Sequence, residues 1–150
     1  GFQLSDHASG AWLGRMALEW ALAAWERLRD HSDLTWALMS QFDSDPRAVA
    51  RFAGTAQPGD FGAFAPQVLE AAEAGDGMAV AVMRQGATHL TTMLGALGHK
   101  PGEVLCLTGG VGRFYVPYLP VETRAGLISP EGTALDGALR LAARHVEVRA

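Results

Sequence analysis

The stretch that decides the predicted fold is Glu103-Val104-Leu105-Cys106-Leu107-Thr108-Gly109-Gly110-Val111-Gly112. Its four consecutive apolar residues, 104–107, lie between Pro101-Gly102 and a glycine cluster, which is typical of a short strand buried on both faces. The glycine turn leads into a predicted helix over 113–119 that Pro117 constrains. A turn of this kind lets a backbone approach a phosphate or nucleotide closely, because glycine lacks a Cβ and free N–H groups face the ligand.

The same turn also suits a tight strand-to-helix connection that binds no ligand. No Gly-Lys-Ser/Thr follows it, so it is not a Walker A loop, and its glycines do not have the GxGxxG spacing. From this stretch alone, both interpretations stay open.

Composition narrows the class of protein. A chain of 150 residues with 49% hydrophobic and 19% charged residues is expected to form one soluble, globular domain with a real core. A net charge of −4 without a basic run argues against nucleic acid as a partner. The single cysteine, Cys106, excludes an internal disulfide or a CxxC metal site and fits a reducing, cytoplasmic setting. The most apolar segment, 11–25, is interrupted by Arg15 and Glu19, so no membrane span is predicted.

Apolar periodicity and capping residues predict a mostly helical chain. The first helix, 10–30, has Ser9 as its N-cap, and its apolar face comprises Trp12, Leu13, Met16, Ala17, Trp20, Ala24 and Leu28. Later helices are predicted at 34–42, after Asp45-Pro46, at 66–74 after a loop over 57–66, at 78–97 between an Asp76 cap and Gly98, and from Ser129-Pro130 to Arg144. We expect helices 10–30 and 78–97 to pack together and to bury Trp12 or Trp20.

Strands are few in this prediction. Residues 1–4 suggest the end of one strand, 104–107 form the central one, and 123–128 form a second. The pattern is a helix-rich α/β piece with too few strands to complete a sheet. The chain also begins on Gly1-Phe2 rather than methionine, so we expect it to be part of something longer.

Three segments resemble one known family in the family's own order. Residues 1–14, GFQLSDHASGAWLG, are similar to the GxGxxLGDEGSGAWLG segment of the BadF/BadG/BcrA/BcrD ATPases, which include glucosamine and N-acetylglucosamine kinases. AEAGD at 72–76 precedes a long predicted helix, and LCLTGGV follows at 105–111. Pro130 and DGALRLA at 136–142 are similar to the closing helix of the family. The resemblance covers nearly all of the chain.

This resemblance implies a fold and a missing part. The chain would be the C-terminal, helix-rich part of an actin/hexokinase-like ATPase, in which two ribonuclease-H-like lobes bind ATP in the cleft between them. The N-terminal lobe would precede Gly1, together with the first phosphate loop, the catalytic aspartate and most of the second lobe's sheet. The chain therefore carries no predicted catalytic residue and no predicted metal ligand, and it supplies half a site.

The resemblance also implies site residues. Asp6 matches the aspartate that hydrogen-bonds the amino sugar, and Thr108, Gly109 and Gly110 match the turn that approaches the nucleotide. A carboxylate suits the first task because it accepts hydrogen bonds from two hydroxyls, or from an amine. The chain departs from the family where Asp-Glu-Gly-Ser has become Asp6-His7-Ala8-Ser9, preceded by Ser5 instead of glycine. Losing the glutamate puts the amino-sugar specificity in doubt and affects ATP use less.

The histidines carry weaker signals. His7 either replaces the lost glutamate or is an exposed loop residue without a role, and the second interpretation is favoured. His31, His89, His99 and His145 lack ligand spacing and are interpreted as surface or helix-end residues.

Three functions follow from these features. The first is an ATP-dependent kinase that phosphorylates an amino sugar or related sugar with Mg²⁺. The second is an ATPase that activates a dehydratase or reductase, as other family members do; its iron–sulfur cluster needs cysteines, and the only one here is placed in a buried strand. The third is a helical interaction module without catalysis. The kinase is preferred because the opening and closing motifs agree in order and spacing.

Self-association is a separate expectation. Four tryptophans in the first 36 residues form more aromatic surface than one helical layer hides. The missing lobe or a second copy is expected to cover part of it, and kinases of this kind are often dimers.

Overall fold

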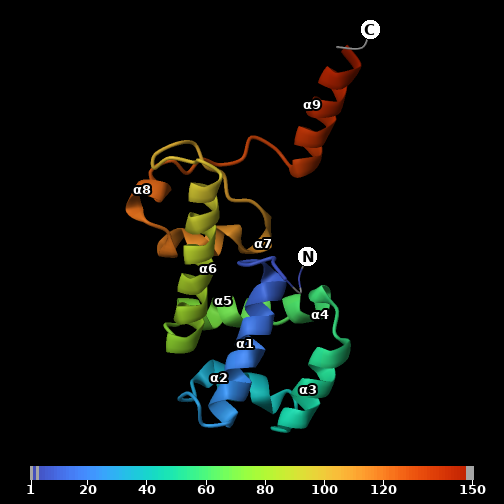
Figure 1. Cartoon of the computed structure of the whole chain (residues 1–150), viewed down its shortest axis with the longest axis vertical. Helices are drawn as coiled ribbons and strands as arrows, with labels where there is room; N and C mark the ends of the chain where they lie inside the picture. The colour runs from blue at the N-terminus through green and yellow to red at the C-terminus, as the bar shows by residue number, and fades with distance from the viewer. Residues whose placement is uncertain (1, 3, 148–150) are drawn as a thin grey trace.

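A computed structural model describes residues 2 and 4–147, the side chains of 145–147 excepted, and it shows an assembly of helices (Figure 1). Helix α1 runs through the middle of the assembly and packs against five other described helices, α2, α3, α4, α5 and α6. The described helices are α1 (Gly10–Trp25), α2 (Asp33–Ser40), α3 (Pro46–Thr55), α4 (Pro58–Gly62), α5 (Ala65–Glu73), α6 (Gly77–Ala96), α7 (Gly109–Gly112), the 3₁₀ helix η1 (Arg113–Tyr118), α8 (Val121–Arg124) and α9 (Ala134–Glu147).

Capping residues set where the first helices begin. The Ser9 hydroxyl accepts a hydrogen bond from the Trp12 N–H at 3.0 Å, as predicted for an N-cap. Asp45 caps α3 ahead of Pro46, and Asp76 caps α6, so both of these predictions are also confirmed. Helix α1 ends at Trp25, earlier than predicted, because Arg27 takes a left-handed φ of 62°.

The later boundaries differ by small amounts. Helices α2 and α5 lie where helices 34–42 and 66–74 were predicted. The predicted loop over 57–66 contains the short helix α4. Gly98, with a φ of 82°, follows the end of α6 as expected for a residue that ends a helix. No helix of the described residues is long and apolar enough to span a membrane.

The packing of α1 against α6 is confirmed. Trp12 is 1% exposed and lies in the same core as Val82 and Met83 of α6, whereas Trp20 is half-buried. Leu28 is an error in the predicted apolar face. It lies beyond the end of α1 and is 74% exposed, because the helix that would have turned it inward has already stopped.

The predicted strands do not form within the described residues. Leu105 makes one isolated parallel bridge with Leu127, in which the Leu105 N–H donates to Gly126 O and the Ile128 N–H donates to Leu105 O. Val104 is 69% exposed and Cys106 is also exposed, so the prediction of a strand buried on both faces is wrong. Burial on both faces needs neighbouring strands and helices on each side, and no other described segment pairs with these residues.

The other strand and helix predictions need correction too. Residues 121–124 form α8, so only the end of the predicted strand at 123–128 contributes to the bridge. Of the predicted strand end at 1–4, Gly1 and Gln3 lie outside the described residues, and Phe2 and Leu4 lie in turns. The last helix begins at Ala134 rather than near Pro130, because Thr133 and Asp136 bond each other's backbone N–H groups and form the cap there.

Candidate functional site

The loop before α1 holds Asp6 in one arrangement. The Ser9 hydroxyl donates to the Asp6 carboxylate at 2.7 Å, and the Ser9 N–H donates to the Asp6 carbonyl at 3.2 Å. Because the same hydroxyl caps α1, the carboxylate is tied to the start of that helix. Asp6 is exposed, so its side chain is accessible to hydroxyl or amine donors of a ligand.

The backbone of this loop shows what one departure from the family's motif costs. Ala8 has a φ of 67°, in the left-handed region that glycine adopts without strain. The family's motif has glycine at this place, whereas this chain accepts a cost of about 1–2 kcal/mol for a side chain there. The Ala8 methyl group is buried in the core, at 5% exposure, and this burial offsets part of that cost.

His7 is not an exposed loop residue without contacts. Its ring stacks on that of His89 from α6, with 3.9 Å between ring centroids and 28° between ring planes. The indole of Trp12 lies beside both rings, at 6.1 Å from His7 and 6.2 Å from His89. His7 and His89 are half-buried, so the interpretation of both as plain surface residues is wrong.

His31 also makes contacts that its spacing did not predict. Its ring stacks on Trp36 at 3.7 Å between centroids, and its Nδ1 is 3.0 Å from the Thr35 hydroxyl. His99 is half-buried just beyond the end of α6, close to its predicted place, and the His145 side chain lies outside those described. Within the described part of the chain, no three His, Cys, Asp or Glu side chains gather in a way that could hold a metal ion.

The glycines predicted to form a turn lie in the short helix α7, and the helix predicted over 113–119 is the 3₁₀ helix η1. Thr108 is extended and exposed and precedes α7, whose first residue, Gly109, has a φ of 81°. Gly110 has neither a positive φ nor a close neighbour, because a Cβ built on it meets no described atom within 4 Å. The backbone conformation therefore explains glycine at 109, whereas packing within the described chain does not explain it at 110.

The helices that follow the two predicted site segments are in contact. A Cβ built on Gly10, at the start of α1, would be 3.7 Å from Cγ1 of Val111 in α7. The helix that follows the Asp6 loop thus touches the helix that follows the glycine turn, although about a hundred residues separate them in the sequence.

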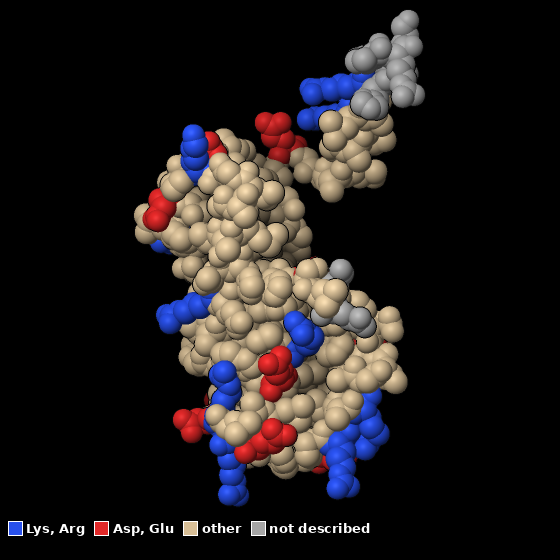
Figure 2. All heavy atoms as spheres, in the orientation of Figure 1, with Lys and Arg blue, Asp and Glu red and all other residues tan. Residues whose placement is uncertain are grey.

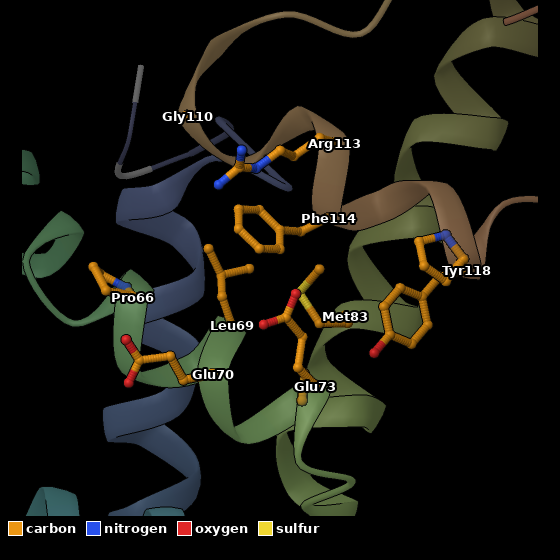
Figure 3. A pocket seen from close by; sticks show the side chains of 11 residues that line it. Pro66, Leu69, Glu70, Glu73, Met83, Gly110, Arg113, Phe114 and Tyr118 are labelled. Carbon is orange, nitrogen blue, oxygen red and sulfur yellow. The ribbon is translucent and has the colours of Figure 1, made fainter.

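A cavity of about 790 Å³ opens beside the glycine turn (Figure 3). Gly110 and Arg113 lie at one end of it, and Phe114 points from η1 toward Leu69 of α5. Two carboxylates, Glu70 and Glu73, come from the same face of α5. The remaining lining residues are Pro66, Ala72, Met83, Pro117 and Tyr118. The cavity thus combines apolar and aromatic walls with a few charged groups, which is the usual character of a small-molecule site.

Comparison with known proteins places this geometry in a family. The chain is 32% identical over 143 residues to the glucosamine kinase GspK of Vibrio cholerae serotype O1, which covers 95% of this chain. It also superimposes with a TM-score of 0.83 and 35% identity, over 94% of its length, on a crystal structure from Chromobacterium violaceum assigned provisionally as an N-acetylglucosamine kinase. The chain is a relative of the BadF/BadG-like sugar kinases. No protein-family model matches it.

The match to these sugar kinases is partial in length. The chain spans about half of each relative, 49% in both cases. Its fold is the helix-rich part of an actin/hexokinase-like sugar kinase, as the resemblance implied.

Sequence reasoning missed most of the cavity's lining. The residues of α5, α6 and η1 around it were interpreted only as helix positions. One signal was available: Leu69 and Glu73 are four residues apart on α5 and so share a face, and Glu70 is three residues before Glu73. That α5 and η1 face each other across a cavity depends on tertiary packing.

Proposed function

We propose that the protein is an ATP-dependent kinase that phosphorylates a hydroxyl of an amino sugar, and that this chain forms the C-terminal part of a two-lobed enzyme. Support comes from two named sugar kinases that match it along nearly its whole length at 32% and 35% identity. The first phosphate loop and the catalytic aspartate would lie in the other lobe, so residues 1–150 supply binding groups and no catalytic residue.

Asp6 is the proposed sugar-binding residue. Its carboxylate is exposed, and only Oδ2 accepts the Ser9 hydroxyl bond. The loop therefore holds Oδ1 in place, and this oxygen can accept a hydrogen bond from a sugar hydroxyl or ammonium group. An ammonium donor would favour glucosamine, whereas N-acetylglucosamine would offer an amide N–H and hydroxyls.

Thr108, Gly109 and Gly110 are the proposed nucleotide-binding turn. The space above Gly110 allows close approach of a phosphate, and the adjacent cavity has the aromatic and apolar walls that suit a nucleobase. Arg113, at the same end of the cavity, would balance phosphate charge. These residues fit ATP, which when bound supplies the γ-phosphoryl group; Mg²⁺ would be held through the phosphates rather than by side chains of this chain.

The second hypothesis, an ATPase that activates a dehydratase or reductase, is not favoured, although the argument from a buried cysteine no longer applies. Cys106 is exposed rather than buried, so its thiol is accessible. An iron–sulfur cluster is typically held by four thiolates, and this chain has one cysteine.

Two substitutions test the kinase proposal in the intact two-lobed protein. Asp6→Asn keeps the size of the side chain and removes its charge, so it should weaken sugar binding by about 1.5–3 kcal/mol and leave the KM for ATP nearly unchanged. Gly110→Val should do the reverse, because it blocks the nucleotide without meeting any described atom within 4 Å at its Cβ. Steady-state kinetics with both substrates varied separates the two effects.

Matched controls lie elsewhere in the chain. Asp30→Asn changes an exposed carboxylate beyond the other end of α1, and Gly54→Val adds a side chain to a glycine of α3 that also has open space. Neither control should alter the kinetics. If Asp6→Asn changed no sugar parameter, the proposed sugar site would lose its residue-level support, and the non-catalytic helical module would become the better hypothesis.

A further inference from the structure

We propose that His89 of α6 is a positioning residue for sugar binding, acting through the ring of His7 on the loop that carries Asp6. This inference rests on the proposed function of that loop. Its basis is the stack of the two imidazoles, 3.9 Å between ring centroids, which joins the loop before α1 to a helix about eighty residues later.

The loop needs such support because its backbone is strained on both sides of His7. Asp6 has a φ of 68° and Ala8 a φ of 67°, so two residues with side chains adopt the left-handed conformation within three positions. Each costs about 1–2 kcal/mol and persists only where surrounding contacts hold it. The Ser9 bonds restrain Asp6, and the buried methyl of Ala8 restrains the other end.

The His7 side chain is a further restraint on this loop. Its ring packs against His89 and lies beside Trp12, which is itself fully buried, so the three rings form one cluster at the junction of α1 and α6. Removing the His89 ring leaves His7 without its stacking partner and frees the loop to leave the strained conformation. Asp6 would then present its carboxylate in only part of the population.

The stack of His7 on His89 also bears on the position of the motif at which the family has glutamate. The family has glutamate where this chain has His7, and the His7 ring is engaged with α6. His7 therefore holds the loop instead of supplying a second carboxylate to the sugar, and Asp6 is the acidic group that the loop offers. The His89 ring is the surface against which the His7 ring stacks in this arrangement.

The test measures dissociation constants for glucosamine and N-acetylglucosamine by calorimetry in the intact two-lobed protein, together with the KM for ATP. If the competent loop falls to a tenth of the population, His89→Ala raises the sugar Kd about 10-fold, since apparent affinity scales with the competent fraction. His89→Phe keeps a ring to stack and should stay within about 2-fold of the unchanged protein. The KM for ATP should not change in either variant. Thr92→Ala, on an exposed position one turn along α6, is the matched control.

A double-mutant cycle gives a second readout. Because His89 acts through His7, the pair His7→Ala/His89→Ala should weaken sugar binding no more than either single change. Additive effects would overturn the inference. So would a failure of His89→Phe to restore the affinity lost in His89→Ala, or a rise in the ATP KM equal to the rise in sugar Kd.

Asp6→Asn, measured alongside, separates this inference from the proposed function. If Asp6→Asn weakens sugar binding and His89→Ala does not, the positioning role is wrong and the sugar site stands. If Asp6→Asn has no effect, the sugar site itself is wrong and the inference falls with it.

Discussion

At the scale of single residues, one tight constraint on the fold joins Gly86 of α6 to Tyr115 of η1. Tyr115 is 1% exposed, and a Cβ built on Gly86 would lie 2.5 Å from its hydroxyl oxygen. That hydroxyl is buried without a hydrogen-bond partner in the described structure, and burial raises the pKa of Tyr115 well above its usual range. The ring of Tyr115 can lie against α6 because position 86 of this helix is a glycine and carries no side chain.

Gly86→Ala should therefore destabilise the chain. Helix propensity alone would favour alanine by about 1 kcal/mol, but overpacking a full core costs about 1–3 kcal/mol, and the rigid ring cannot yield as a flexible chain end can. Tyr115→Phe should instead stabilise the chain by about 1 kcal/mol, because it removes an unpaired buried hydroxyl. Urea unfolding of both variants checks the two signs. A Gly86→Ala protein more stable than the parent would show that η1 moves away from α6 easily.

At the scale of elements, one carboxylate orders two helices. Asp76 Oδ1 accepts from the Met78 and Ala79 N–H groups at 3.0 Å, which caps α6, and Oδ2 accepts from the Leu34 N–H of α2 at 3.1 Å. Burial tends to raise the pKa of this carboxyl, but the hydrogen bonds from Ala79, Leu34, Ser32 and Met78 together hold it below the ordinary value of 3.8.

Asp76→Ala should lower the free energy of unfolding by about 1–2 kcal/mol, because two helix starts lose an acceptor. Since the folded pKa is depressed, the contribution of the carboxylate is complete above the unfolded pKa, near 4, and is lost as the pH falls through the lower folded value. Denaturant titrations between neutral and acid pH should show a smaller acid-induced loss in Asp76→Ala than in the parent. Asp45→Ala, which removes the cap of α3 and an exposed ion pair with Arg51 but no bond to a second helix start, is the matched control and should cost less. Equal losses would mean that the bond to α2 adds nothing.

At the scale of the whole molecule, the helices around α1 form one packed body, and α9 stands apart from it (Figure 1). The side chains described in α9 are all exposed, including Leu135 at 67%, Leu139 at 61% and Leu141 at 67%. Figure 2 shows arginine, aspartate and glutamate side chains gathered toward the end that holds α2 and α3, whereas Lys100 lies just beyond the C-terminal end of α6.

Helix α9 should therefore be the least stable helix of this 150-residue chain. Local opening costs little where few apolar contacts are buried, so its amides should exchange with deuterium at nearly unprotected rates, while those of α1 and the first half of α6 should be strongly protected. Hydrogen-exchange mass spectrometry with peptides from each helix measures this difference. Protection of α9 equal to that of α1 would show that its leucines are covered in solution.

Self-association and a cytoplasmic location stay predictions. Trp36 is 52% exposed and stacks on His31, so aromatic surface does remain open at this end of α1 and α2, as the dimer hypothesis requires. Trp12 is buried within the chain and contributes nothing to such an interface.

The sequence by itself determined the local elements and the family. Ser9, Asp45 and Asp76 mark helix starts because a short polar side chain before an apolar run satisfies backbone donors locally, without help from distant residues. Gly98 marks a helix end for a similarly local reason, since it adopts a positive φ at little cost. The motif order around Asp6 and Gly109 also needed no coordinates to suggest a sugar kinase.

Only the tertiary structure decided what lies against what. A run such as 104–107 becomes a buried strand only if other strands pair with it, and the described chain offers a single bridge at Leu127. The stack of His7 on His89, the contact of Gly10 with Val111, and the cavity between α5 and η1 likewise join residues that are far apart in sequence. No local pattern records such contacts, because they result from how whole helices pack.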